Sequence, residues 1–593
     1  MNDVVCLVFP PHMRIDAYYV TPPLGLLSIG AALEARGINV VVKDLIFKMR
    51  NGELASDENI YDNSVKEIMN CNPRIVALST QCVTYPTCIN IAKRIKEIDP
   101  TIKIIFGGHN SSFLDEDTLR EFTYVDCVAR GEGEIVIPNL IEKLLKNESL
   151  YDVKGITFRD NDKVVRNDDE ELITDLDTLP FPAYHLVNSM EEYKKLGETM
   201  TVLIESGRGC VYNCIFCSNC ILWHRKVRYK SINKVIEEIK QLEKFKPDEY
   251  YLVHDFFTFD ENYVRDFCTQ LKENNLFIKW NCRCRLNVSK ETLKMMKEAG
   301  CERLLYGVES GSEKVLKIMR KNIRFDHVYS SIQNTIESGI IPSLSFVVGI
   351  PGEELEDLGK TLHLILMSSL VGNCYPFMQI ISPLPGTTVL QNYSKDLYLW
   401  KGNAFSRGIE YDNGVRMNED IELIKKYPEM FCSFYNVKSD IPMEYLSEIS
   451  TVYCIIVEMF SYAYYLYCTI HNLSEIELYD IWHSWMAERG MNDIENMSKR
   501  DIWKYFDLFM TDNFIDNIIL INIAKYVHNR YLMEIYIDES EKIKVDFDID
   551  ISELISYLKK HKYEDYKVSK KNTTLLLVKD GYNVKTLKKK DTI

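Results

Sequence analysis

Three closely spaced cysteines are the residues of this 593-residue chain best suited to chemistry. Cys210, Cys214 and Cys217 form a C-x3-C-x2-C run. Thiolates are soft ligands that hold iron-sulfur clusters, and a cluster of four irons normally takes four of them. A set of three leaves one iron open to an outside ligand. The run therefore predicts a 4Fe-4S cluster that takes part in a reaction rather than only storing electrons.

Chance and structural zinc are the alternatives to a cluster at this run. With 17 cysteines in the chain, such a spacing can arise by chance. Cys220 also extends the run by a fourth thiol, and four cysteines can close a structural zinc site. The paired cysteine knuckles that are typical of zinc sites are missing from this sequence, which favours the iron-sulfur interpretation.

The residues around the run place it at the end of a strand. The apolar stretch 201–204 predicts a strand, and Gly207 and Gly209 allow the backbone to turn sharply after it. Ligands of barrels and open parallel sheets bind at the carboxyl ends of the strands. Helix-like stretches at 232–245 and 289–299 then alternate with further strands, which predicts a parallel (β/α) barrel or partial barrel.

Together with Phe216, the run resembles the C-x3-C-x-aromatic-C loop of the radical S-adenosylmethionine (radical SAM) superfamily. Segments at 250–258, 279–285, 307–311, 345–353 and 382–387 resemble later motifs of this family, in the family's order. The resemblance implies a 4Fe-4S cluster on the three cysteines, with S-adenosylmethionine (SAM) bound to the open iron. By the same resemblance, the residues that contact SAM are Tyr212, Phe216, Asp255, Arg285, Glu309, Ser310, Val347 and Gly349.

The N-terminal part has a pattern of its own. Strand-like and helix-like stretches alternate from 4 to 130, which predicts a doubly wound parallel sheet. The segments P-P-L-G-L, G-G-H and R-G-E-G-E resemble the cobalamin-binding domain found upstream of many radical SAM barrels. The sequence has no D-x-H-x-x-G motif, so a cobalt-ligating histidine from that motif is not expected, and His109 is interpreted as an ordinary loop residue. The resemblance implies that cobalamin contacts Leu24, Gly25, Ser79, Thr80, Gln81, Gly107, Gly108 and Glu132.

These patterns predict an α/β fold class with a Rossmann-like N-terminal domain, a parallel partial barrel and a mainly helical C-terminal region. In the last part of the chain, a strand is expected at 533–537. The predicted domains are a cobalamin-binding-like domain (1–150), a connector (151–200), a radical SAM core barrel (201–390), a helical region (391–531) and a small α/β module (532–593).

Composition sets outer limits on function. The chain is 46% hydrophobic and 27% charged, an ordinary globular balance, and we find no signal peptide and no uninterrupted apolar run that spans a bilayer. A net charge of −16 argues against general binding to nucleic acid or to an anionic membrane. Many cysteines outside a small secreted frame indicate a reducing cytoplasm, and an exposed cluster requires anaerobic conditions.

The family resemblance also implies a reaction. An enzyme of this kind cleaves SAM reductively to a 5'-deoxyadenosyl radical and, with cobalamin, methylates an unactivated carbon of a peptide or secondary-metabolite precursor. The alternatives are a radical SAM cyclase or rearrangement enzyme without methyl transfer, and a non-catalytic cobalamin-binding regulator. Expected partners are a low-potential electron donor of the flavodoxin or ferredoxin type and a peptide or small-molecule substrate. No catalytic side chain is expected beyond those that position the cofactors.

Overall fold

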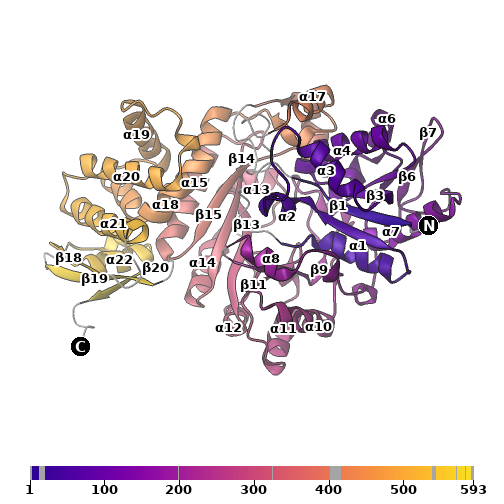
Figure 1. Ribbon diagram of the computed structural model, residues 1–593. Helices are drawn as coiled ribbons and strands as arrows, with labels where there is room; N and C mark the ends of the chain where they lie inside the picture. The colour runs from indigo at the N-terminus through magenta and orange to yellow at the C-terminus, as the bar shows by residue number, and fades with distance from the viewer. Residues whose placement is uncertain are drawn as a thin grey trace. The chain divides into compact units, whose positions relative to one another are not determined.

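The computed structural model describes residues 3–11, 21–197, 199–323, 325–400, 416–536, 542–568, 571–580 and 583–588. The chain forms two compact units. The first unit combines residues 1–303, 319–321 and 381–438, and the second combines residues 304–318, 322–380 and 439–593. Figure 1 colours the chain from indigo at the N-terminus to yellow at the C-terminus.

The N-terminal part of the first unit is a seven-stranded sheet with the strand order β2-β1-β3-β4-β5-β6-β7. Strands β1 to β5 pair in parallel, and β6 and β7 extend the sheet in antiparallel fashion. The order reverses around β1, so the carboxyl ends of β1 and β3 flank the position where doubly wound sheets bind ligands. The strands are β1 (Val4–Phe9), β2 (Val40–Asp44), β3 (Pro73–Ser79), β4 (Lys103–Gly107), β5 (Cys127–Ala129), β6 (Ile156–Asp160) and β7 (Lys163–Arg166).

Helices cover both faces of this sheet (Figure 1). Helices α1 and α7 contribute to one apolar core, and α3 and α4 contribute to the other. Residues 424–435, from much later in the chain, complete the second core. Next to them, the buried Asp420 accepts hydrogen bonds from Tyr61 (2.6 Å) and Asn90 (2.8 Å). The helices are α1 (Leu24–Glu34), α2 (Leu45–Arg50), α3 (Ile60–Met69), α4 (Tyr85–Ile98), α5 (His109–Phe113), α6 (Asp115–Glu121), α7 (Gly133–Lys146) and α17 (Asn418–Lys426).

The rest of the first unit contains three parallel strands, β8, β11 and β12, which alternate with helices α10, α11 and α12. Each helix begins at a side chain that accepts a hydrogen bond from its first turn, namely Ser231, Asp260 and Ser289. An antiparallel ribbon of β9 and β10 follows β8. The elements are α8 (Met190–Lys195), β8 (Thr201–Glu205), β9 (Gly207–Arg208), α9 (Asn219–Leu222), β10 (Arg228–Tyr229), α10 (Ile232–Leu242), β11 (Glu249–Val253), α11 (Glu261–Glu273), β12 (Trp280–Cys284) and α12 (Lys290–Glu298).

The second unit continues the alternation and then becomes helical. Strands β14 and β15 pair in parallel, and β18, β19 and β20 form a small antiparallel sheet. Strand β13 begins in the first unit and ends in the second. The elements are β13 (Cys301–Glu309), α13 (Glu313–Ile318), α14 (Val328–Glu337), β14 (Ile341–Val348), α15 (Leu355–Val371), β15 (Tyr375–Ile380), α18 (Met443–His471), α19 (Glu475–Ala487), α20 (Lys499–Asn513), α21 (Ile518–Tyr536), β18 (Lys542–Phe547), α22 (Ile551–Lys559), β19 (Thr573–Asp580) and β20 (Asn583–Lys588).

Helix α18 is long and apolar enough to cross a membrane by length and composition, although Glu458 interrupts its apolar run. It is the one helix of this kind among the described residues, and 78% of its apolar window is buried. Its neighbours are α15, α20, α21 and β15. A central helix of a protein core gives the same signal.

The strand expected at 533–537 is wrong for its described residues. Helix α21 runs to Tyr536 and occupies that position, and Ile537 lies outside the described residues. Alternating apolar residues in a short segment fit the end of a helix as well as a strand.

Candidate functional site

The cluster loop, residues 209–219, follows the ribbon strand β9. It begins at Gly209, whose φ is +93°, and a Cβ there would overlap the carbonyl oxygen of Lys226. Cys210, Cys214 and Cys217 are partly buried. All 17 cysteines of the chain lie in its described part, and all are free thiols. A strained turn that only glycine accommodates therefore sets the position of the predicted cluster ligands.

Two features of the loop bear on metal binding. Burial raises the pKa of Cys210 and raises that of Cys217 to about 12, so iron would have to displace protons from these thiols. Cys220 donates a hydrogen bond to the carbonyl oxygen of Cys217 (3.0 Å). Among the described residues, no group of three or more His, Cys, Asp or Glu side chains lies close enough to hold a single ion.

Asp255, two residues after the end of β11, joins the two ends of the cluster loop. Its carboxylate accepts a hydrogen bond from the backbone N–H of Gly209 (3.0 Å) and another from the side-chain amide of Asn219. The sequence predicts that Asp255 contacts SAM, and the contacts found within the chain are to the loop. The carboxylate can therefore fix the loop's conformation without touching a ligand.

Tyr212 and Arg285, both predicted to contact SAM, lie together. The guanidinium carbon of Arg285 is 3.6 Å from the centroid of the Tyr212 ring, a cation–π arrangement. Tyr212 also packs against Phe256, with ring centroids 5.9 Å apart. Phe216, in the same loop, is partly buried. The first unit thus groups a cation and aromatic rings at the cluster loop.

The other four predicted SAM residues belong to the second unit, and all are buried. Glu309, at the end of β13, has a φ of +73°, which is rare for a non-glycine residue and typical of functional sites. Ser310 is within hydrogen-bond distance of the Thr361 hydroxyl (3.1 Å). Val347 lies near the end of β14. Gly349 directly follows this strand, and its backbone N–H donates a hydrogen bond to the carboxylate of Glu353.

Sequence reasoning gave no role to Glu353. Its Oε2 accepts hydrogen bonds from the backbones of Gly349 (2.5 Å) and Ile350 (3.3 Å). Burial raises the pKa of Glu353 to about 7 against the opposing effect of these two hydrogen bonds. A buried carboxylate of this kind shapes the turn after β14.

A cavity of about 230 Å³ lies at the carboxyl ends of the N-terminal strands. A Cβ added at Gly25 or Gly131 would meet no atom within 4 Å, whereas one at Gly108 would lie 2.7 Å from the Thr80 carbonyl oxygen. The cavity is smaller than a typical site for a drug-sized molecule, so it would enclose only part of a corrinoid. A glycine-lined edge of this kind fits the close approach of a large flat ligand. The predicted cobalamin residues that line it are Gly25, Ser79, Gly107, Gly108 and Glu132.

The other three predicted cobalamin residues are absent from the cavity's lining. Leu24 begins α1, and Gln81 is exposed at the start of a short 3-10 helix. Thr80 is buried, and its hydroxyl donates to the Gly107 carbonyl (3.0 Å) and accepts from the Ser111 N–H (3.2 Å). Thr80 therefore stabilises the turn that follows β4, and it does not line the cavity.

The cavity is also lined by three residues that sequence reasoning missed, namely Glu205, Arg208 and Trp223. They flank the cluster loop in the chain. Arg208 forms ion pairs with Glu132 and Glu134, each at 2.6 Å. Burial alone would lower the pKa of Arg208, but its carboxylate neighbours raise it well above the usual value. In the sequence, only one signal could have indicated this pairing, namely the opposite charges of the segments R-G-C (208–210) and R-G-E-G-E (130–134).

His109 also lies at the cluster loop and is absent from the cavity's lining. Its Nε2 is 2.5 Å from the Ser218 hydroxyl. Burial lowers the pKa of His109, which favours the neutral ring. The histidine thus contacts the residue next to Cys217.

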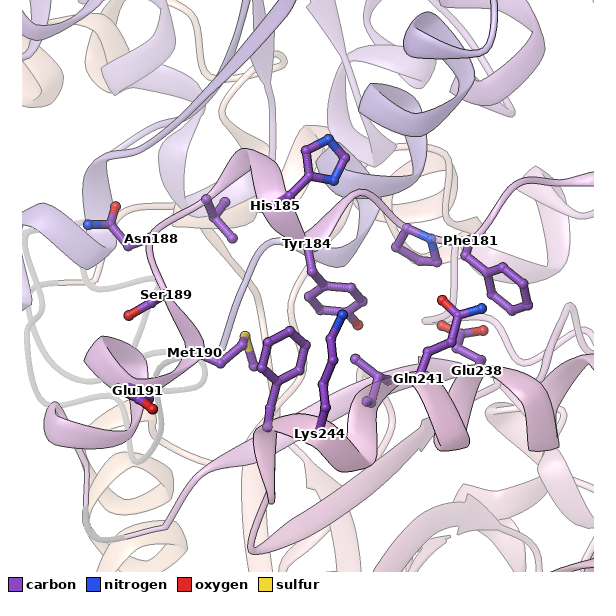
Figure 2. Close-up of a pocket in the computed structure, with 14 residues that line it drawn as sticks. Phe181, Tyr184, His185, Asn188, Ser189, Met190, Glu191, Glu238, Gln241 and Lys244 are labelled. Carbon is purple, nitrogen blue, oxygen red and sulfur yellow. The ribbon is translucent and has the colours of Figure 1, made fainter. Parts of the chain in front are cut away.

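A larger cavity, of about 580 Å³, lies between the connector and α10 (Figure 2). Tyr184 and Lys244 extend into it from opposite walls in this view. None of the predicted cofactor residues lines it, so its size alone does not make it the candidate site.

Comparison with known proteins gives two family matches. The model of the radical SAM superfamily matches residues 204–365, and that of the B12 binding domain matches residues 12–141. The chain is 28% identical over 388 residues to "Uncharacterized methyltransferase PH0819" of Pyrococcus horikoshii, covering 65% of this chain and 81% of that protein. It is 25% identical over 377 residues to the anaerobic magnesium-protoporphyrin IX monomethyl ester cyclase of Cereibacter sphaeroides, covering 60% of this chain and 61% of that protein.

A solved structure has a similar fold. The radical SAM methyltransferase TsrM from Kitasatospora setae, with cobalamin and a 4Fe-4S cluster bound, superposes with a TM-score of 0.58 at 15% identity, covering 77% of this chain and 89% of that one. The predicted fold class is confirmed by this likeness and by the two family matches. The chain is therefore an enzyme of the radical SAM superfamily with a B12-binding domain upstream of its radical SAM domain.

Proposed function

We propose that this enzyme is a cobalamin-dependent radical SAM methyltransferase that acts on an unactivated carbon. One observation carries the proposal: residues that flank the cluster loop also line the glycine-rich cavity of the B12-binding domain. Arg208 and Trp223, on either side of the three cysteines in the chain, line that cavity. A corrinoid held there would lie beside the loop on which SAM is expected.

The residues have distinct proposed roles. Cys210, Cys214 and Cys217 would hold the 4Fe-4S cluster, and the glycine-lined edge would hold cobalamin. When bound, the cluster with SAM supplies radical chemistry and cobalamin supplies the methyl group. Asp255 fixes both ends of the cluster loop. The guanidinium of Arg285 would bind the carboxylate of SAM. The protein's contribution is therefore positioning and the exclusion of side reactions.

The finer proposal concerns substrate and electron donor. We propose a peptide or another secondary-metabolite precursor as substrate, and a flavodoxin or ferredoxin as low-potential donor. The family resemblance supports both, and the net charge of −16 disfavours a nucleic-acid substrate.

A second candidate is a radical SAM cyclase without methyl transfer. The likeness to the magnesium-protoporphyrin cyclase favours it, because that relative aligns with 60% of this chain. Both candidates would use the same cluster and SAM site, and they differ in the fate of SAM. Both candidates cleave SAM to methionine and 5'-deoxyadenosine. A methyltransferase forms S-adenosylhomocysteine in addition to 5'-deoxyadenosine, whereas the cyclase forms 5'-deoxyadenosine as the only adenosyl product.

The test is anaerobic purification with cobalamin supplied, followed by addition of SAM and a low-potential reductant. Corrinoid absorbance with both SAM products would support the methyltransferase, and 5'-deoxyadenosine alone would favour the cyclase. Cys214→Ala should abolish the cluster absorbance and the cleavage of SAM, because the cluster loses one of three ligands. The matched control is Cys220→Ala, which should keep both. Full SAM cleavage by Cys214→Ala would refute the cluster assignment, and equal loss in both variants would favour a four-thiol metal site.

A further inference from the structure

A buried charge network joins the B12-binding domain to the start of the cluster loop. The Arg208 guanidinium donates to Glu132 (2.6 Å), Glu134 (2.6 Å) and Glu205 (2.7 Å). The exposed fraction of the Arg208 side chain is 7%, and those of Glu132 and Glu134 are 3% and 9%. Arg228 makes a second contact with Glu132 (2.9 Å). Charges buried to this degree are retained only where each is paired.

The position of this network ties it to both candidate cofactor sites. Glu132 immediately precedes α7, Glu134 lies in its first turn, and both line the glycine-rich cavity. Arg208 lines the same cavity and stands two residues before Cys210. Arg208 therefore links the edge proposed for cobalamin to the chain segment that carries the first proposed cluster ligand.

The far end of the cluster loop has a matching contact. His109, at the start of α5 in the same domain, is within hydrogen-bond distance of Ser218 (2.5 Å). Ser218 directly follows Cys217, so both ends of the three-cysteine run contact the B12-binding domain. Asp255 holds the same two ends from the barrel side, through Gly209 and Asn219. The loop is thus fixed between two domains of one unit.

We infer that Arg208 is a positioning residue that couples the cobalamin site to the iron-sulfur cluster, so that occupation of one site alters the environment of the other. This inference rests on the proposed function, because it requires both groups to bind. Arg208 acts through Glu132 and Glu134 on the cavity and through the backbone of Gly209 on the cluster loop. Coupling of this kind is reciprocal, so it appears in the binding of either group.

The geometry of arginine makes this inference testable. Three carboxylates receive hydrogen bonds from different edges of one planar guanidinium. Lysine keeps the charge but cannot reproduce this fork, so Arg208→Lys separates geometry from charge. The matched control is Arg94→Lys, because Arg94 also pairs with two carboxylates, Asp62 (2.9 Å) and Glu419 (2.8 Å), and lines neither proposed site.

The experiment uses the full chain with its cluster reconstituted anaerobically. The first readout is the dissociation constant of hydroxocobalamin by equilibrium dialysis. The second is the electron paramagnetic resonance spectrum of the reduced cluster with and without cobalamin. In wild type, we expect cobalamin to shift the cluster spectrum. In Arg208→Lys, we expect that shift to disappear and the dissociation constant to rise by about 10-fold, the scale of losses seen for outer contacts of metal sites.

A second variant keeps the inference testable if Arg208→Lys does not fold. Glu134→Gln preserves the shape of the side chain and removes one charge, and it should move both readouts in the same direction. The inference is overturned if both variants match wild type, or if Arg94→Lys changes the readouts as much as they do. Wild type that binds neither group would instead overturn the proposed function, and the inference with it.

Discussion

At the scale of single residues, the candidate site depends on unusual backbone conformations. Gly209 and Gly108 have φ angles of +93° and +113°, and in both a Cβ would run into neighbouring backbone. The sequence could predict the first turn, because glycines next to a metal-binding run imply one. It could not predict the φ of +73° at Glu309, because nothing in a glutamate or its neighbours in the chain signals strain.

Gly209→Ala tests the turn at the cluster loop. A Cβ would overlap the Lys226 carbonyl, a backbone atom that cannot move alone, and the positive φ adds strain of about 1–3 kcal/mol. We expect iron and sulfide content after reconstitution to fall several-fold. Iron analysis of the purified variant checks this, and normal cluster content would show that the turn does not position the cysteines.

At the scale of elements, sequence patterns predicted which segments gather at one sheet edge better than they predicted which charged side chains pair. The alternation of strands and helices placed the glycine-rich segments at one sheet edge, and five of eight predicted cobalamin residues line the cavity there. The pairing of Arg208 with Glu132 joins positions 76 residues apart, and no local pattern encodes which distant charge will be met. The strand prediction at 533–536 was wrong for a related reason. The local alternation of apolar and polar residues there fits a helix and a strand alike.

Gly25→Ala tests the cavity independently of stability. Gly25 lies in the first turn of α1, where a Cβ meets no protein atom within 4 Å. Alanine in a helix should stabilise the fold by up to about 1 kcal/mol relative to glycine, while its methyl group enters the space proposed for cobalamin. We therefore expect an unchanged or higher thermal midpoint and weaker hydroxocobalamin binding. Unaltered affinity in a stable variant would place the ligand elsewhere.

At the scale of the whole molecule, stability should depend on pH through Asp44. This buried residue at the end of β2 accepts hydrogen bonds from Phe47 N–H (2.9 Å) and from Tyr193 in α8 of the connector (2.7 Å). Burial raises its pKa from 3.8 to about 6 despite these hydrogen bonds. The folded state therefore binds the proton more tightly than the unfolded state. The resulting stabilisation is complete below pH 4 and is lost as the pH rises through about 6.

Asp44→Asn removes this dependence. Between pH 4 and 7, wild type should lose up to about 3 kcal/mol more free energy of unfolding than the variant, since one pKa unit corresponds to about 1.4 kcal/mol. Urea titrations of both proteins at several pH values measure the difference. Parallel pH profiles would mean that Asp44 is not the responsible group.

The packing of residues 424–435 against α3 and α4 has a consequence for biosynthesis. The ribosome makes the residues of the N-terminal sheet early. One apolar face of this sheet is covered completely only when residues 424–435 leave the ribosome, after the cluster loop and the strands that follow it. Until then, the nascent chain carries an uncovered apolar surface, the kind of intermediate that chaperones bind. The part of the protein made first is thus completed only after residues 424–435 have been made.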